Sequence, residues 1–206
     1  METTANLNDM KTKLEKLGYT VSVFENKEQA TDYIDSKIDG SSVGFGGSVT
    51  IKEMGLYDRL EKHNKVFWHN HPIPEGKTAA QIIQEASCAE NYISSVNALA
   101  MTGEIINIDG RCNRVSEIFY GHKKVYLIAG INKIAPDYDS ALYRARNIAA
   151  PKNAQRLKLK TPCAIKADKC YNCSSPDRIC NGLAVLWSKP YGSEYEIILV
   201  NEPLGY

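Results

Sequence analysis

Short apolar runs with strand character alternate with amphipathic stretches along most of this chain, and this alternation restricts its fold more than any other feature. We expect strands at residues 19–24, 43–45, 66–68 and 124–130, and helices at residues 7–17, 27–38, 50–63, 78–90, 113–120 and 137–150. Pro151 should end the last of these helices. Alternation of this kind predicts an α/β, Rossmann-like fold, with a mainly parallel sheet and helices on both of its faces.

Two strand pairs are expected in addition to this pattern. Residues 92–101 and 104–108 are apolar runs on either side of Thr102-Gly103. Residues 182–188 and 194–201 flank the turn sequence Pro190-Tyr191-Gly192, which predicts a C-terminal β-hairpin. A length of 206 residues fits a single domain over residues 1–206.

The charge balance argues against partners that are recognised mainly by charge. The chain has 25 basic and 24 acidic residues, so no electrostatic footprint for nucleic acid is expected. The N-terminal 19 residues lack the apolar segment of a signal peptide, and no stretch has the length of a membrane span. We therefore expect a cytoplasmic protein; whether it forms a homo-oligomer is left open.

Four of the six cysteines fall close together in residues 161–182, a segment with the character of a loop. Cys163, Cys170, Cys173 and Cys180 are spaced by six, two and six residues. In a reducing compartment, clustered thiolates favour a soft metal or an iron–sulfur cluster. Structural zinc usually uses two closely spaced cysteine pairs, whereas only one close pair is present here. A 4Fe–4S cluster is therefore favoured over zinc, and zinc over cysteines without a metal.

A glycine-rich turn follows the strand at residues 43–45. Gly46, Gly47 and Ser48 precede the helix at residues 50–63, where backbone amides at the helix start favour a phosphate or carboxylate. The alternative is a tight turn in which Ser48 only caps the helix.

Polar residues along the strand pair at residues 92–108 suggest a substrate pocket at the sheet end. We expect Asn97 and Arg144 to contact a small anionic substrate, and Glu104 and Asp109 to be catalytic. The alternative is a solvated hairpin that turns at Asp109-Gly110. His69 and His71 have a spacing compatible with a metal, but lining a pocket or hydrogen bonding at a strand end is favoured.

These segments resemble the LUD domain, the lactate-utilization family. The resemblance rests on ordered blocks: Gly46-Gly47-Ser48, Ser95-Val96-Asn97, Thr102-Gly103, Asn107-Ile108-Asp109-Gly110, Gly130-Ile131-Asn132-Lys133-Ile134 and Arg144-x-Arg146. It implies the fold of ribose-5-phosphate isomerase, glucosamine-6-phosphate deaminase and coenzyme A transferases. The C-terminal cysteines are similar to those of the short cysteine-containing branch of the family.

The resemblance implies oxidation of L-lactate or a similar hydroxy acid, with redox partner proteins and an iron–sulfur cluster. An open iron position, with three cysteines as ligands, would make the protein an enzyme in its own right. Two other functions stay open. One is a sugar-phosphate isomerase or acyl-coenzyme A enzyme, and the other is a non-catalytic module that zinc stabilises and that senses an anion.

Overall fold

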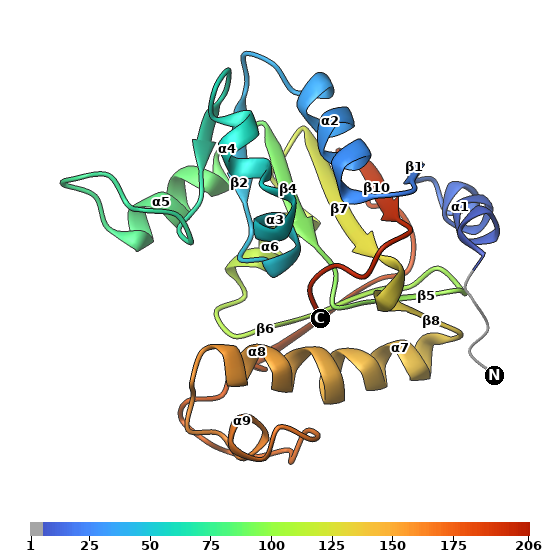
Figure 1. Ribbon diagram of the computed structural model, residues 1–206, viewed down its shortest axis with the longest axis vertical. Helices are drawn as coiled ribbons and strands as arrows, with labels where there is room; N and C mark the ends of the chain where they lie inside the picture. Colours follow the sequence, from blue (N-terminus) through green and yellow to red (C-terminus); the bar gives the residue numbers. More distant parts are fainter. Residues whose placement is uncertain (1–5) are drawn as a thin grey trace.

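The computed structural model describes residues 6–206, and residues 1–5 of the polar N-terminal stretch lie outside it. Its main element is a six-stranded sheet in which all five strand pairs are parallel, in the order β1-β10-β7-β4-β2-β3 (Figure 1). The strands are β1 (Thr20–Phe24), β2 (Ser42–Phe45), β3 (Lys65–Phe67), β4 (Asn91–Ser95), β7 (Lys124–Gly130) and β10 (Glu194–Val200). The predicted α/β class with a mainly parallel sheet is confirmed.

Helices cover both faces of this sheet. On one face lie α2 (Lys27–Lys37), α3 (Val49–Met54) and α4 (Leu56–Leu60), which pack their apolar side chains against Ile93, Tyr126 and Ile198. On the other lie α1 (Leu7–Lys16) and α6 (Asn113–Phe119), which pack against Tyr92, Leu127 and Leu199. Alternating residues of the central strands therefore enter two separate cores, as expected for a sheet that is buried on both sides. The helix α5 (Ala79–Ser87) packs near β2 and β3.

A smaller sheet of four strands lies at one end of the large one. Its order is β8-β5-β6-β9, made by β5 (Ala98–Ala100), β6 (Ile105–Asp109), β8 (Ile134–Ala135) and β9 (Gly182–Leu186). One face contributes Leu99, Ile105 and Leu186 to the core of the large sheet. The other face packs on α7 (Tyr138–Arg144), which continues through residues 145–149 into α8 (Ala150–Arg156) (Figure 1).

The predicted C-terminal β-hairpin is wrong. β9 pairs antiparallel with β6 in the small sheet, whereas β10 lies between β1 and β7 in the large one. The two runs differ in burial: β9 alternates between buried and more exposed residues, as an edge strand does, and β10 is buried from Tyr195 to Val200. A continuous apolar run of that kind suits the centre of a parallel sheet.

Other predicted elements differ in their bounds. The helix predicted at residues 50–63 is divided into α3 and α4 by Gly55, whose backbone is left-handed. The strand predicted at residues 92–101 divides at Val96 and Asn97, so that β4 belongs to the large sheet and β5 to the small one. The helix expected to end at Pro151 continues to Arg156. A π-helical turn at Ala145–Ala149 precedes Pro151, and such a turn relieves the clash and the lost hydrogen bond that proline brings to a regular helix.

The cysteine-rich segment extends from α8 back to β9 and includes the short helix α9 (Pro162–Lys166). Thr161 caps α9 by accepting a hydrogen bond from the Ala164 amide at 3.3 Å. In Figure 1 this segment lies beyond α8, on the side away from the large sheet. In the described part of the chain, no helix is both long and apolar enough to cross a membrane.

Candidate functional site

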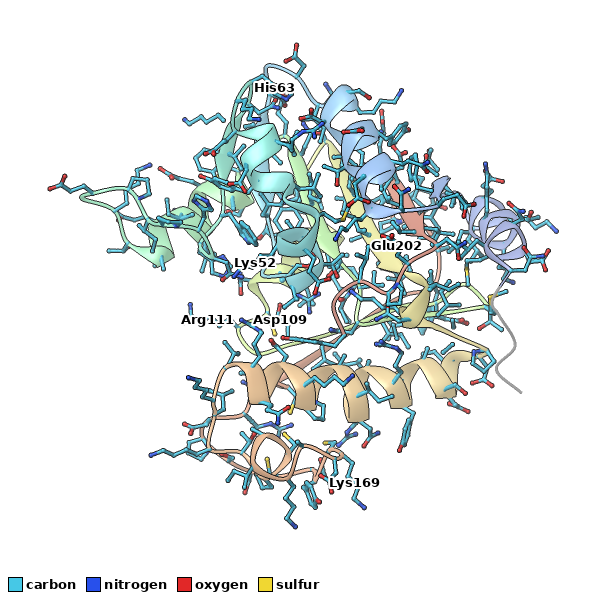
Figure 2. The ribbon with its side chains drawn as sticks, in the orientation of Figure 1. Lys52, His63, Asp109, Arg111, Lys169 and Glu202 are labelled. Carbon is cyan, nitrogen blue, oxygen red and sulfur yellow. The ribbon has the colours of Figure 1, made fainter. Side chains whose placement is uncertain are left out.

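A cavity of about 380 Å³ lies at the carboxyl ends of the parallel strands, between the large sheet and α8. Its wall includes residues that directly follow β2, β3, β4 and β7: Gly47, Ser48, His69, Asn70, Val96, Asn97 and Lys133. Asp109, the last residue of β6, and Arg111, two residues further on, also line it and lie above α8 in Figure 2. Pockets of open α/β sheets commonly occupy this position. We call this cavity the strand-end pocket.

The glycine turn supplies part of this wall, and Gly46 has a packing role. A β-carbon on Gly46 would lie 2.8 Å from both Arg114 Cγ and Ser94 Oγ, so only glycine lets Arg114 come so close. Gly47 and Ser48 line the pocket, whereas Gly46 does not. Ser48 accepts a hydrogen bond from the Ile51 amide as the cap of α3, and its Oγ lies 2.7 Å from Ser95 Oγ.

Arg114 is the buried centre of a hydrogen-bond network under the pocket floor. Its guanidinium donates to the side-chain oxygens of Asn107 and Asn97 at 2.5 and 3.2 Å, and to the carbonyls of Ser95 and Ile108 at 3.1 and 2.8 Å. Asn97 in turn accepts a bond from the Ile108 amide at 2.7 Å. These contacts join the break between β4 and β5 to the end of β6. Asn107 supports the pocket wall from behind, and Arg114 and Asn97 are both wall residues and part of this support.

Asp109 lines the pocket, but its carboxylate is already engaged. It accepts hydrogen bonds from the amides of Arg111, Cys112 and Arg114 at 3.1, 3.3 and 3.1 Å. The amides of Cys112 and Arg114 are at the start of α6, and Asp109 therefore stabilises that helix start.

Glu104 and Arg144, predicted to meet the substrate, are not among the residues that line the pocket. Glu104 lies in the turn between β5 and β6, where its carboxylate accepts a hydrogen bond from the Thr102 hydroxyl. Arg144 donates to the carbonyls of Asn132 and Asn97, at 2.7 and 2.6 Å. It therefore attaches α7 to the segments that form the pocket, without lining it.

Lys133 is a pocket residue to which no role was assigned from the sequence. It is buried, and its Nζ donates a hydrogen bond to Thr50 Oγ1 at 2.8 Å. Burial, together with the nearby Arg144 and Arg114, lowers the pKa of its ammonium to about 7. The available signal was its position three residues after β7, a strongly apolar strand of the predicted sheet, because ligands in open α/β folds bind beyond the carboxyl ends of the strands.

The two histidines of the His69-Asn70-His71 sequence do not form a pair. His69 lines the pocket, where burial, and then Arg111, lower its pKa. His71 instead stacks on the Tyr57 ring, with centroids 3.7 Å apart, and lies 3.6 Å from Asp58. The favoured reading, in which a histidine helps to line a pocket, applies to His69.

A second, smaller cavity is lined by all four cysteines of the C-terminal segment. Cys163, Cys170, Cys173 and Cys180 face it together with Arg146 and Arg178. None of them forms a disulfide, and the remaining cysteines, Cys88 and Cys112, are exposed and do not line it. We call this cavity the cysteine pocket.

Two arginines make the surroundings of these thiols positive. Burial favours the neutral Cys170 thiol, but the Asn172 amide and the Arg146 guanidinium outweigh it and hold the Cys170 pKa below its usual range. Arg178 donates to the carbonyls of Cys173 and Cys180 at 3.0 and 2.9 Å, and its Nε is buried without a hydrogen-bond partner.

Within residues 6–206, no three Cys, His, Asp or Glu side chains are disposed to hold a metal ion as they stand. The cysteine pocket has a volume of only about 20 Å³, but its composition fits a thiolate-bound group. Four free thiols share one wall, two arginines offset negative charge, and the buried Arg178 Nε is a donor without an acceptor.

The two cavities are neighbours. Ala150, at the start of α8, and Ile179, next to Cys180, line both of them. A β-carbon on Gly110 would lie 3.0 Å from Ile179 Cα, so the cysteine segment packs directly on the strand-end pocket wall. The Asn181 amide also donates to the Asp109 carbonyl at 3.0 Å.

The parallel sheet, with the strand-end pocket at the carboxyl ends of its strands, defines an α/β protein of the Rossmann-like class. The family model of the LUD domain matches residues 7–200, and the chain belongs to this family. A crystal structure of a DUF162 family protein from Deinococcus radiodurans, DUF162 being the earlier name of LUD, is similar, with a TM-score of 0.52. Its sequence identity is 10%, over 94% of this chain and 95% of that one, so the similarity concerns the fold alone.

A weaker similarity is to eIF2B beta from Chaetomium thermophilum, with a TM-score of 0.30 and 11% identity over 65% of this chain and 44% of that one. A similarity at this level supports no conclusion about function. A search of curated proteins returns no match.

Proposed function

We propose that this LUD-family protein binds a 4Fe–4S cluster through Cys163, Cys170, Cys173 and Cys180, and assists the oxidation of a small hydroxy acid such as L-lactate. The observation that carries the proposal is the common wall of the two cavities. Ala150 and Ile179 line both the cysteine pocket and the strand-end pocket. A cluster held by the thiols would therefore lie next to a substrate held at the strand ends.

The surroundings of the cysteines support an anionic metal group. A cluster with four thiolate ligands carries net negative charge. Its reduction potential depends on neighbouring charges and on hydrogen bonds to sulfur. Arg146 and Arg178 supply positive charge at this cavity, and the Asn172 amide donates to Cys170 Sγ at 3.4 Å. Zinc bound by the same four thiolates is the alternative, and metal analysis distinguishes zinc from an iron–sulfur cluster.

The charges of the strand-end pocket support an anionic substrate. Three arginines line it, namely Arg111, Arg114 and Arg156, against one side-chain carboxylate among the described lining residues, Asp109. Both oxygens of that carboxylate are bound to the start of α6. The field inside the pocket therefore favours a carboxylate ligand over a neutral or cationic one.

Oxidation of a 2-hydroxy acid to a 2-oxo acid releases two electrons and two protons. We expect the electrons to leave to an electron-accepting partner protein, because the chain's own side chains do not accept them. When bound, the cluster would supply either one-electron transfer or, with three cysteine ligands, an open iron site. The pocket residues would bind and orient the carboxylate.

Metal analysis of protein purified without oxygen tests this proposal. Iron, sulfide and zinc are counted per chain in the wild type, in Cys170→Ala and in Cys88→Ala. The last is a matched control, since Cys88 is exposed and does not line the cysteine pocket. We expect about four irons and four sulfides in the wild type and in Cys88→Ala, and their loss in Cys170→Ala. One zinc per chain and no colour would reject the cluster and support a structural metal.

A further inference from the structure

Lys133 is the only primary amine among the described residues that line the strand-end pocket. Its burial is unusual, because lysine is almost never fully buried without a charged partner. No ion pair joins Lys133 to a carboxylate within residues 6–206. This buried amine needs an explanation that packing alone does not provide.

The hydrogen bonds at Lys133 fix how its amine is presented. Thr50 donates its hydroxyl hydrogen to the Leu204 carbonyl at 3.3 Å, so its oxygen is free to accept from Lys133 Nζ at 2.8 Å. That contact holds one side of the amine, and Lys133 is one of the residues that line the pocket. The amine is thus held in one orientation, unlike the amine of a flexible lysine on the surface.

Two cationic groups near Lys133 oppose its protonation, and one carboxylate favours it. Arg144 on α7 and Arg114 on α6 are both cationic, and the nearby carboxylate on α3, Glu53, accepts a hydrogen bond from the Gly205 amide at 2.8 Å. Tyr206, which also lines the pocket, is a phenol whose pKa is raised by burial. A lysine that is desolvated beside other cations is a recognised form of nucleophilic amine, because much of it is uncharged at neutral pH.

We propose that Lys133 Nζ is a nucleophile that forms a reversible imine with the carbonyl carbon of a small 2-oxo acid bound in the strand-end pocket. The class of ligand rests on the function proposed above, since a 2-oxo acid is the product of oxidising a 2-hydroxy acid. The carboxylate of the ligand would be held by two arginines that line the same pocket, Arg111 and Arg156.

The step needs no oxidant. The nitrogen forms a bond to the carbonyl carbon, and the carbonyl oxygen leaves as water with one proton from the amine and one from solvent. The product is a protonated imine, which retains positive charge beside the ligand carboxylate. Hydrolysis reverses the step, so the imine would hold the 2-oxo acid without consuming it.

Reductive trapping tests this inference on the full chain. The protein is incubated with pyruvate and sodium cyanoborohydride, and the modified lysines are located by peptide mass spectrometry. We expect a carboxyethyl group on Lys133 that saturates with pyruvate, and a rate that rises through about pH 7 and then levels. The exposed lysines of the same chain, such as Lys52 and Lys169, serve as internal controls.

Two variants keep the test independent of folding. Lys133→Arg retains the charge and Lys133→Met removes it, and both should lose the saturable adduct while the other lysines react as before. Adducts spread over exposed lysines, or a Lys133 adduct that forms only near the ordinary lysine pKa of about 10.4, would overturn the inference. Imine formation needs neither the cluster nor a redox partner. Iron counts on the same preparation therefore show which of the two proposals has failed.

Discussion

Gly46 and Arg114 fit together so closely that a β-carbon on Gly46 would lie 2.8 Å from Arg114 Cγ. Arg114 joins four acceptors at the base of the strand-end pocket, two side-chain oxygens and two carbonyls. Only a glycine directly after β2 therefore leaves room for the hydrogen-bond network that shapes the pocket.

Gly46→Ala should lower the free energy of unfolding by about 1–3 kcal/mol, the usual cost of overpacking a rigid site. Urea denaturation measures the loss. Gly47→Ala is the matched control, because its β-carbon would meet only the side chains of Asn70 and His69, at 3.3 Å or more. Equal stability of the two variants would contradict the packing role of Gly46.

Arg146→Ala should reduce the iron that the protein retains and speed its loss in air. The substitution removes a positive charge beside Cys170 and the 2.6 Å hydrogen bond to Asn172, both within the cysteine segment. Iron content is followed by absorbance during exposure to oxygen. The control is Arg59→Ala, whose guanidinium pairs with Asp32 and Asp35 on α2. Iron loss as slow as in the wild type would contradict a role for Arg146 in holding the cluster.

Stability should depend on pH through Lys133. Its pKa is about 7 in the folded chain and about 10.4 when unfolded, so between these values the unfolded chain binds more protons. The free energy of unfolding of the wild type, relative to Lys133→Met, should therefore rise with pH across this window. The slope is up to about 1.4 kcal/mol per pH unit. Urea titrations at several pH values measure it, and a constant difference between the two proteins would contradict a neutral buried amine.

Arg111→Ala should weaken the binding of L-lactate or pyruvate by about tenfold, as expected for the loss of one charged contact to a carboxylate. Isothermal titration calorimetry measures the affinity. Lys52→Ala is a charge-matched control, because Lys52 is on α3 and does not line the pocket (Figure 2). Equal losses in both variants would show a general effect of net charge instead of a contact.

The fold was largely predictable because its strongest strands carry local signals. Residues 124–130 form a long apolar run, and such a run is buried in a parallel sheet whatever its neighbours are. The error at the C-terminus has a different origin. Pro190, Tyr191 and Gly192 form a turn, but the partners of the strands on either side, β6, β1 and β7, are distant in sequence. Local turn chemistry does not specify pairing of that kind.

The site was predictable only in part. Gly47, Ser48, Asn97 and Asp109 were placed in a pocket by the sequence patterns, and all four line it. Arg144 was expected to contact the substrate, whereas it donates to two backbone carbonyls. Lys133 was missed for a related reason: its burial depends on Thr50 and on residues 204–205, which no local pattern connects to it.

The central claim is that a cluster on the four cysteines lies beside a pocket for a small carboxylate. Electron paramagnetic resonance of the reduced, anaerobically purified protein, recorded with increasing pyruvate, tests it most directly. We predict an iron–sulfur signal whose shape changes with pyruvate and saturates at the concentration at which the ligand binds. A signal that stays the same while calorimetry shows binding would contradict the proximity of the two sites.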